Sequence, residues 1–254
     1  MRLDVALVPD EAIGWEAKVV IMVDVIRASS TIVTLLEFGC RYIFPFSDSR
    51  TALAMADELG LLSIGEKNGE VVPGFHFNNS PLQLMSADVR GKDIILSTTN
   101  GTLALEKLAG ANRNTVMIGS AINATACAGL SLATAFSAGR DLGIACAGRN
   151  SKFAMDDMVC AGLLAARIIA AARYGGIIID QSDGATAALR LYHAYPSLMA
   201  AFIESESGQI LKQLGQEGDL EPCSQIDASI VVPVVSRCPE VTGLRIEKSV
   251  LKRC

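Results

Sequence analysis

A dense run of polar residues follows an entirely apolar stretch near the start of the chain. Residues 19–23 read Val-Val-Ile-Met-Val, and Asp24, Arg27 and the hydroxyl run Ser29–Thr31 come next. An arginine guanidinium is a planar fork that suits an oxyanion, and the free amides of a helix N-terminus also favour anions. A single serine here would predict only a helix N-cap. The combination of an acid, an arginine and three hydroxyls favours an anion-binding function.

Two further clusters occupy the same kind of position, after one predicted strand and before a predicted helix. Residues 97–102 read Ser-Thr-Thr-Asn-Gly-Thr, which is more polar side chains than a turn requires. The glycine in this run allows the backbone to approach a ligand closely. The second cluster, Gly119–Ala124, is weaker, because Asn123 alone is typical of a helix N-cap.

The remaining candidates carry carboxylates. Cys146–Asn150 includes Arg149, and Asp156 and Asp157 begin the helix that follows. Acids in a first helical turn often only complement the helix dipole, but Mg²⁺ also takes one or two carboxylates together with water and phosphate oxygens. Glu66 follows another short apolar run, where a lone glutamate is more typical of a solvated loop. Residues 78–81, Asn-Asn-Ser-Pro, are typical of a turn with proline in the first helical position.

The elements that must position these residues alternate along the first two-thirds of the chain. Short β-branched runs predict strands, and alanine- and leucine-rich segments between them predict helices. This alternation predicts an α/β fold with a largely parallel or mixed sheet and flanking helices. Ligands bind such sheets beyond the carboxyl ends of the strands, which is where four of the polar clusters are predicted to lie. The predicted strands are Leu3–Val8, Val19–Val25, Tyr42–Phe44, Leu61–Ile64, Asp93–Leu96, Thr115–Ile118, Leu142–Cys146 and a late edge strand, Ser229–Val235, with Pro233 inside it.

Length and composition restrict the class of protein. The 254 residues predict one unit spanning 1–254, with two closely packed lobes and a seam near residues 110–145 as the alternative. Half of the residues are hydrophobic, which excludes a disordered chain. The net charge of −5 argues against a nucleic-acid partner. The longest apolar stretch, Val159–Ile179, contains two arginines, so no membrane span is expected. Seven cysteines without a C-x-x-C spacing predict a reducing, cytoplasmic location.

Several common catalytic patterns are absent from the sequence. It contains no G-x-G-x-x-G, no G-x-x-x-x-G-K-[ST] and no G-x-S-x-G. Asp24 is not followed by a second aspartate two positions on, so the aspartyl-phosphate pattern D-x-D fails. Two histidines, His76 and His193, cannot make a three-histidine zinc site. The residues therefore predict a site for a small anion and a metal, and they leave hydrolysis, transfer and binding open.

The combination of these motifs, in order, resembles the 2-phosphosulfolactate phosphatase family. The resemblance begins at Asp24, continues through Gly65-Glu66, residues 79–81, 97–102 and 119–124, and extends to the helix after Cys146. It implies a Mg²⁺-dependent phosphatase that converts 2-phospho-3-sulfolactate and water to 3-sulfolactate and phosphate, a step of coenzyme M biosynthesis in methanogens. It also implies a fold unlike the common phosphatase folds.

The resemblance and the residues together suggest roles for individual side chains. Asp24, Arg27 and Asp157 are the expected catalytic residues, and Asp24, Glu66, Asp156 and Asp157 are the expected Mg²⁺ ligands. The family pattern has a Glu-Asp pair where this chain has Asp156-Asp157, so Asp157 is the better match. Arg149 is expected to hold the sulfonate or carboxylate of the substrate. The expected substrate-binding residues are Ser29, Ser30, Thr31, Asn79, Ser80, Thr99, Asn100, Gly101, Thr102, Asn123 and Arg149.

Four points stay open at this level. The nucleophile is either metal-activated water or a carboxylate such as Asp24. The substrate is 2-phospho-3-sulfolactate or another small phosphorylated hydroxy acid, and a homo-oligomer is compatible with the sequence. A non-enzymatic anion-binding regulatory protein is the competing interpretation. Such a protein would not need Asp24, Glu66 and Asp157 together, and their joint presence favours the enzyme.

Overall fold

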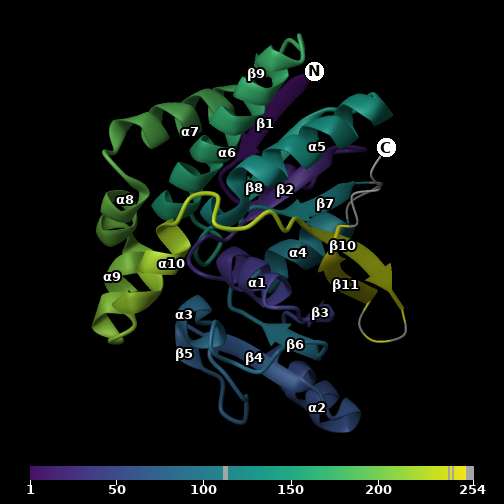
Figure 1. Cartoon of the computed structure of the whole chain (residues 1–254), viewed down its shortest axis with the longest axis vertical. Coiled ribbons are helices and arrows are strands. Elements are labelled where there is room, and N and C mark those ends of the chain that lie inside the picture. Colours follow the sequence, from purple (N-terminus) through teal and green to yellow (C-terminus); the bar gives the residue numbers. More distant parts are fainter. Residues whose placement is uncertain (111–113, 240, 242, 250–254) are drawn as a thin grey trace.

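The computed structural model describes residues 1–110, 114–239, 241 and 243–249, and it has a mixed sheet with helices on both faces (Figure 1). Within these residues the strand order is β5-β4-β6-β3-β11-β10-β7-β2-β8-β1-β9. The strands are β1 (Arg2–Ala6), β2 (Val19–Val23), β3 (Tyr42–Pro45), β4 (Leu62–Lys67), β5 (Glu70–Val71), β6 (Asp93–Ser97), β7 (Thr115–Ile118), β8 (Leu142–Cys146), β9 (Asp180–Gln181), β10 (Pro233–Cys238) and β11 (Gly243–Lys248). The predicted α/β class and mixed sheet are confirmed.

Two parallel groups of strands make up most of this sheet. One group contains β4, β6 and β3, and the other contains β7, β2, β8, β1 and β9. The antiparallel hairpin β10–β11 lies between them and pairs with β7 on one side and β3 on the other. Figure 1 shows the smaller parallel group below the larger one, with the hairpin at the right. The suggested seam near residues 110–145 stays a prediction.

The helices follow the predicted alternation. The long helices are α1 (Ala28–Glu37), α2 (Ser49–Leu59), α4 (Gly101–Gly110), α5 (Ala124–Ala138), α6 (Met155–Tyr174) and α7 (Asp183–Ala194). The shorter helices are α3 (Pro81–Leu84), α8 (Leu198–Glu204), α9 (Glu206–Gln213) and α10 (Leu220–Ser224), with single turns η1 (Pro9–Ala12), η2 (Ala121–Asn123) and η3 (Glu217–Asp219). In Figure 1, α8, α9 and α10 lie at the left, beside α3 and β5.

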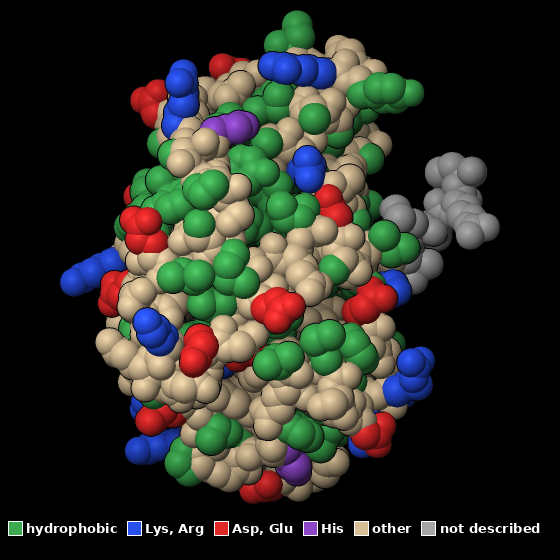
Figure 2. All heavy atoms as spheres, turned by 60° about the vertical axis from the view of Figure 1, so that its left-hand side comes forward, with side chains coloured by type: hydrophobic (Ala, Val, Ile, Leu, Met, Phe, Trp, Pro, Cys, Tyr) green, Lys and Arg blue, Asp and Glu red, His purple; other side chains and the backbone are tan. Residues whose placement is uncertain are grey.

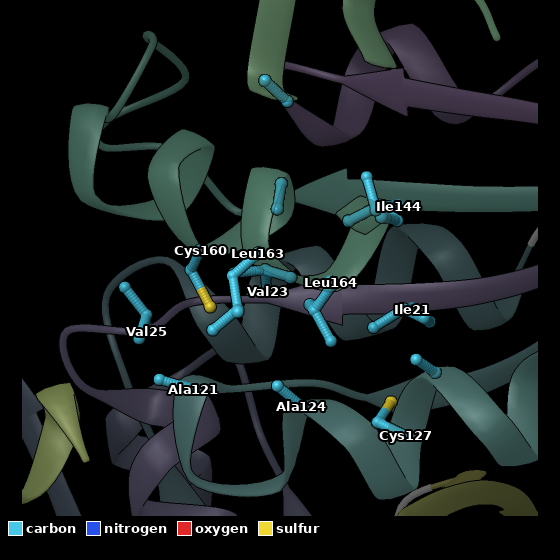
Figure 3. Close-up of a cluster of buried hydrophobic side chains, with 14 of the residues drawn as sticks. Ile21, Val23, Val25, Ala121, Ala124, Cys127, Ile144, Cys160, Leu163 and Leu164 are labelled. Atoms are coloured by element: carbon cyan, nitrogen blue, oxygen red, sulfur yellow. The ribbon is translucent and has the colours of Figure 1, made fainter. Parts of the chain in front are cut away.

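The central strand β2 explains how the core divides into two layers. All five of its residues are buried, as its apolar sequence predicts for a strand covered on both faces. Ile21 and Val23 join the cluster that contains α5 and α6, and Figure 3 shows Ile21 near Leu164 and Val23 near Leu163. Val20 and Met22 point the other way and pack with residues of α1 and α4. The alternation of side chains along β2 thus supplies both layers of the core from one strand.

One predicted strand has a different place in the sheet. Ser229–Val235 was expected at an edge because Pro233 cannot donate to a ladder. The structure instead begins β10 at Pro233 and places this strand between β11 and β7, so the edge prediction is wrong. A proline at the first residue of a strand is tolerated, because the hydrogen bonds of the hairpin with β11 continue from Val234 onward.

One segment has the length and composition of a membrane span. The window Ala121–Ala138 is long and apolar enough to cross a membrane, but half of it is buried inside the fold, as for the core helix of a globular domain.

The groove between α6 and α7 is lined by Ile169, Ala170 and Leu189 among others. Figure 2 shows hydrophobic side chains gathered over the upper half of the face that carries α7 and α8. The six cysteines within the described residues are free and buried.

Candidate active site

The loops after four parallel strands line one pocket. They follow β2 and β8 of the larger parallel group and β4 and β6 of the smaller group, so the pocket lies where the two groups face each other. The helix α9 closes its remaining side. The lining residues are Asp24, Ile26, Arg27, Glu66, Asn68, Gly69, Asn79, Thr99, Asn100, Arg149, Asn150, Ser207, Ile210 and Leu211. The prediction that the strand ends carry the site agrees with this position.

Asp24 lies at the centre of this arrangement, directly after β2. Its Oδ1 accepts a hydrogen bond from the Ala28 amide at 3.2 Å, at the start of α1. Its Oδ2 lies over Gly101, where a Cβ atom would sit 2.7 Å from it. The glycine is therefore needed so that the N-terminus of α4 can approach the carboxylate. Burial and the negative charge of Glu66 raise the pKa of Asp24 to about 7.

Glu66 holds the two loops of the smaller parallel group together. Its carboxylate accepts hydrogen bonds from the amides of Gly69 and Thr99, both at 2.6 Å, and from the Thr99 hydroxyl at 2.9 Å. Because Glu66 and Asp24 line the same pocket, two carboxylates from distant parts of the chain meet there. Such pairs suit a divalent cation bound through oxygen.

Asp157 ties the loops of the larger group together from behind the pocket. Its two oxygens accept the amides of Val25 at 2.9 Å and Gly148 at 3.0 Å. Burial, together with the charges of Asp156 and Asp24, raises its pKa. Asp157 does not line the pocket, whereas Asp24 and Glu66 do. The geometry makes it a positioning residue for the loops after β2 and β8.

Asp156 is equally buried but faces the start of α9. Its Oδ1 accepts a hydrogen bond from Ser207 Oγ at 3.1 Å, and burial raises its pKa to about 6. It lines a second hollow with Arg149, Ser207 and Phe153, which adjoins the first pocket through Arg149 and Ser207. Asp156 thus contributes negative charge beside the pocket without lining it.

The four predicted metal ligands are therefore not gathered into one cluster. Within the ranges that the structure describes, no three histidine, cysteine or acidic side chains are arranged to hold a metal ion. A smaller oxygen donor set does fit Mg²⁺, which usually needs only one or two carboxylates from the protein. Asp24 and Glu66 supply them. Asn79 Oδ1 is buried against the same pocket and accepts no hydrogen bond from any described residue.

Arg27 lines the pocket, but both of its terminal nitrogens are engaged within the protein. Nη1 donates to Asp219 Oδ2 and to Gln216 Oε1, each at 2.6 Å, and Nη2 donates to the Gly69 carbonyl at 3.1 Å. Asp219 also accepts the Ser80 hydroxyl at 2.7 Å. The expected oxyanion fork is thus committed to a buried ion pair that fixes the segment after α9. Asp219 and Gln216 were missed, because nothing local in the sequence links them to Arg27.

Several predicted substrate-binding residues lie behind the pocket wall. Ser29 Oγ accepts the Asp24 amide, and Ser30 bonds to the Val25 carbonyl and to Ser120. Thr102 exchanges hydrogen bonds with Thr98 at the start of α4. These contacts shape the loops rather than line the cavity. The predicted substrate-binding residues outside the lining set are Ser29, Ser30, Thr31, Ser80, Gly101, Thr102 and Asn123.

Helix capping accounts for two of those residues. Ser80 caps α3 by accepting the Gln83 amide, and Asn123 completes a capping box at η2. Asn123 Nδ2 also donates to the Val231 carbonyl at 2.9 Å, far along the chain. The geometry therefore supports the simpler interpretation that Ser80 and Asn123 are helix caps.

The pocket also contains residues that the sequence interpretation missed. Asn68, Asn150 and Ser207 line it, together with apolar side chains from α9. A signal for Asn68 was present, since Asn68-Gly69 between two extended runs is a strong hairpin pattern. The pattern predicts a turn and not a binding side chain, so it does not by itself point to Asn68 as a site residue. The predicted residues Asn79, Thr99, Asn100 and Arg149 do line the pocket.

The fold and this pocket define an α/β protein with paired carboxylates, amides and arginines at its strand ends. The sequence model of 2-phosphosulpholactate phosphatase matches residues 6–237. A probable 2-phosphosulfolactate phosphatase of Thermus thermophilus is 37% identical over 239 residues, which is 92% of this chain and 94% of the relative. Proteins with the same printed name from Symbiobacterium thermophilum (35%, 85% of this chain and 91% of the relative) and Deinococcus radiodurans (33%, 92% and 93%) are also similar.

The chain therefore belongs to the 2-phosphosulpholactate phosphatase family, and it is an enzyme of the phosphoric monoester hydrolase class. The family resemblance found in the sequence is confirmed.

Proposed function

We propose that this enzyme hydrolyses 2-phospho-3-sulfolactate to 3-sulfolactate and phosphate and that it requires Mg²⁺. The observation that carries the proposal is the meeting of Asp24, Glu66 and the unpartnered Asn79 Oδ1 in one pocket. A buried acceptor without a donor is costly unless a ligand completes it. A cation is the ligand that two carboxylates and a carbonyl oxygen would share.

Asp24, Glu66 and Asn79 are the residues that would hold Mg²⁺, with Asp156 and Asp157 adding negative charge from behind. The bound ion would supply positive charge to the phosphoryl oxygens, which is the main requirement of phosphoryl transfer. Burial of Asp24 next to Glu66 also explains why the pKa of Asp24 is raised, since the Ala28 amide and the charge of Arg27 lower it by less. Of the four carboxylates predicted to bind the metal, the proposal thus retains Asp24 and Glu66.

The remaining lining residues orient the substrate. Thr99 and Asn100 border the start of α4, where amides and side chains can meet phosphoryl oxygens. Arg149 is the residue that would bind the acid group that is not transferred. Its ion pair with Glu206 is long, at 3.4 Å, and Glu206 is exposed, so the guanidinium is available to a substrate. Arg27 acts through Asp219, Gln216 and Gly69, which it holds around the pocket.

Hydrolysis adds water across the phosphorus–oxygen bond, so that the hydroxyl of sulfolactate leaves with a proton and phosphate takes the hydroxide. Water is one possible nucleophile, and the Asp24 carboxylate, held between the ends of α1 and α4, is the other. Acid quenching during turnover separates the two, because only the second leaves phosphate on the protein. The coenzyme M pathway and a cytoplasmic location stay predictions from the resemblance and the composition.

The test is phosphate release from synthetic 2-phospho-3-sulfolactate, measured with Mg²⁺ and with EDTA. Phospholactate and p-nitrophenyl phosphate serve as comparison substrates. We expect release that depends on Mg²⁺ and is fastest for the sulfonated substrate. Release from phospholactate alone would move the substrate to another phosphorylated hydroxy acid. No release from any substrate would favour the anion-binding interpretation.

A further inference from the structure

We propose that Asn68 and Asn150 bind the acid group of the substrate that is not transferred, its carboxylate or sulfonate. This inference rests on the proposed function and adds two specificity-determining residues to it. Both residues line the pocket, and both are exposed at its rim, whereas Asn79 is buried at its floor. The substrate class that fits is a small hydroxy acid phosphorylated on one carbon, with further anionic groups on its neighbours.

Each of the two asparagines occupies the first central position of a tight turn. Asn68 and Gly69 connect β4 to β5 and have φ angles of 54° and 89°. Asn150 and Ser151 have φ angles of 49° and 60°, and the flanking residues Arg149 and Lys152 exchange backbone hydrogen bonds at 2.9 Å. Positive φ at both central residues is the mark of a type I′ turn. The side chains are therefore carried on stiff supports.

One dipeptide anchors both turns. The backbone amide of Asn68 donates to Thr99 Oγ1 at 2.9 Å, and the backbone amide of Asn150 donates to Asn100 Oδ1 at 2.9 Å. Because Thr99 and Asn100 are adjacent in sequence, the two turns are held next to the same loop. One turn belongs to the smaller parallel group and the other to the larger. The rim is thus assembled only when both groups are in place.

Charge explains why amides would be used at this rim. The pocket already contains Asp24 and Glu66, while Arg27 is paired with Asp219 and Arg149 with Glu206. Arg27 is committed to its buried pair with Asp219, so a substrate with several negative charges needs donors beyond Arg149. A primary amide has two N–H donors and carries no charge, so it can bind an oxyanion without forming an ion pair with Asp24 or Glu66.

A purely structural explanation of these asparagines makes a different prediction. Asparagine is one of the few residues that tolerate positive φ, so each could be present only to form the turn. Glycine satisfies the same backbone requirement and lacks the amide. Replacement by glycine therefore removes the side chain and retains the turn. Replacement by aspartate retains the turn and replaces the N–H donors with negative charge.

The experiment compares Asn68→Gly, Asn150→Gly and Asn150→Asp with the wild type in two assays. The first is turnover of 2-phospho-3-sulfolactate, and the second is calorimetric binding of 3-sulfolactate, which has no phosphoryl group. We expect each glycine variant to raise KM and weaken 3-sulfolactate binding by about tenfold or more, with kcat changed less than about threefold. Asn150→Asp should bind 3-sulfolactate more weakly than Asn150→Gly does.

Ser151→Gly is the matched control, because Ser151 is in the same turn with φ of 60° but does not line the pocket. It should bind and turn over as the wild type does. The proposal is overturned if the asparagine variants bind 3-sulfolactate as tightly as Ser151→Gly, or if the wild type does not bind it. Binding that depends on the asparagines without any turnover would reject the hydrolytic function alone.

Discussion

Asp24 shows how one residue can be unfavourable for the fold and suited to a site. Its carboxylate is almost completely removed from water, and Glu66 and Asp156 add negative charge nearby. One hydrogen bond of 3.2 Å from the Ala28 amide and the charge of Arg27 offset only part of this. A buried acid without a cation costs stability. An enzyme tolerates such a cost where a ligand restores the balance of charge.

Asp24→Asn should therefore stabilise the metal-free protein while it abolishes catalysis. The amide retains an oxygen for the Ala28 hydrogen bond and removes the buried charge. At pH 8, above the pKa of about 7, we expect the free energy of unfolding to rise on the order of 2 kcal/mol. Phosphate release should fall at least about 100-fold. Urea unfolding at pH 8 and pH 5 checks the first expectation.

At pH 5 the wild-type Asp24 is largely protonated, so the gain in stability from Asp24→Asn should nearly disappear. Asp88→Asn is the control, because Asp88 forms an exposed pair with Lys92 far from the pocket. It should leave stability and turnover within error of the wild type. Equal stability of Asp24→Asn and the wild type at pH 8 would contradict the argument that the buried charge is unfavourable.

Residue types alone point to some side chains that line the pocket and to others that lie outside its lining. Asp24, Glu66, Asn79 and Arg149 could be found because polar side chains at strand ends converge in α/β sheets. Arg27 could be found, but its role could not. The Arg27 guanidinium is ion-paired with Asp219, which is 192 residues away in the sequence. No local pattern encodes that pairing, since it depends on where α9 and η3 return to the sheet.

Elements were more predictable than the contacts between them. Apolar β2 and the alanine-rich α5 and α6 followed from their patterns, because burial on two faces or one face sets the hydrophobic period. The position of β10 did not follow, because a proline excludes only the middle of a central strand and not its first residue. The direction in which α9 covers the pocket depends on packing that no periodicity describes.

The contact between α6 and α7 gives a prediction about elements. Gly162 lies where the two helices approach so closely that an added Cβ would be 2.2 Å from the Ala188 carbonyl oxygen. Gly162→Ala must therefore push the helices apart, and we expect a loss of about 1–3 kcal/mol in the free energy of unfolding. Chemical denaturation measures this loss. A variant as stable as the wild type would show that the helices are not packed backbone to backbone here.

Gly129 in α5 provides the matched control for that prediction. A Cβ there would have no atom within 4 Å apart from its chain neighbours and the backbone of its own helix. Since alanine favours helix more than glycine does, Gly129→Ala should raise stability by about 0.5–1 kcal/mol. Opposite signs for the same substitution in two helices would separate close packing from intrinsic helix propensity.

At the scale of the whole molecule, the site exists only because two parallel groups of strands are fixed to each other. The hairpin β10–β11 joins them within the sheet, and Asn150 to Asn100 and Arg27 to Gly69 join them across the pocket. Three acids of this region, Asp24, Asp156 and Asp157, have raised pKa values because burial disfavours their charge. Their titration should therefore be visible in the stability of the entire fold.

The sign of that dependence follows from proton binding. Between the ordinary pKa of 3.8 and the raised values of about 6 and 7, the folded protein retains protons that the unfolded chain has released. Stability must then fall as pH rises through this window and level off once both states are ionised. Asp48, whose pKa is lowered by hydrogen bonds from Thr51, acts in the opposite direction only near and below pH 4. We expect the metal-free protein to be less stable at pH 8 than at pH 5.

If Mg²⁺ binds the ionised carboxylates of Asp24 and Glu66 as proposed, it should reverse this loss of stability. With Mg²⁺ at about 100 times its Kd, linkage predicts roughly 2.7 kcal/mol of stabilisation, or about 5–10 °C in Tm for a chain of this size. The rise should be larger at pH 8 than at pH 6, since protons compete for Asp24 at the lower pH. Thermal unfolding at matched ionic strength with NaCl measures it. An equal Tm rise in Asp24→Asn would place the cation elsewhere, because that variant lacks the carboxylate whose burial the ion is argued to offset.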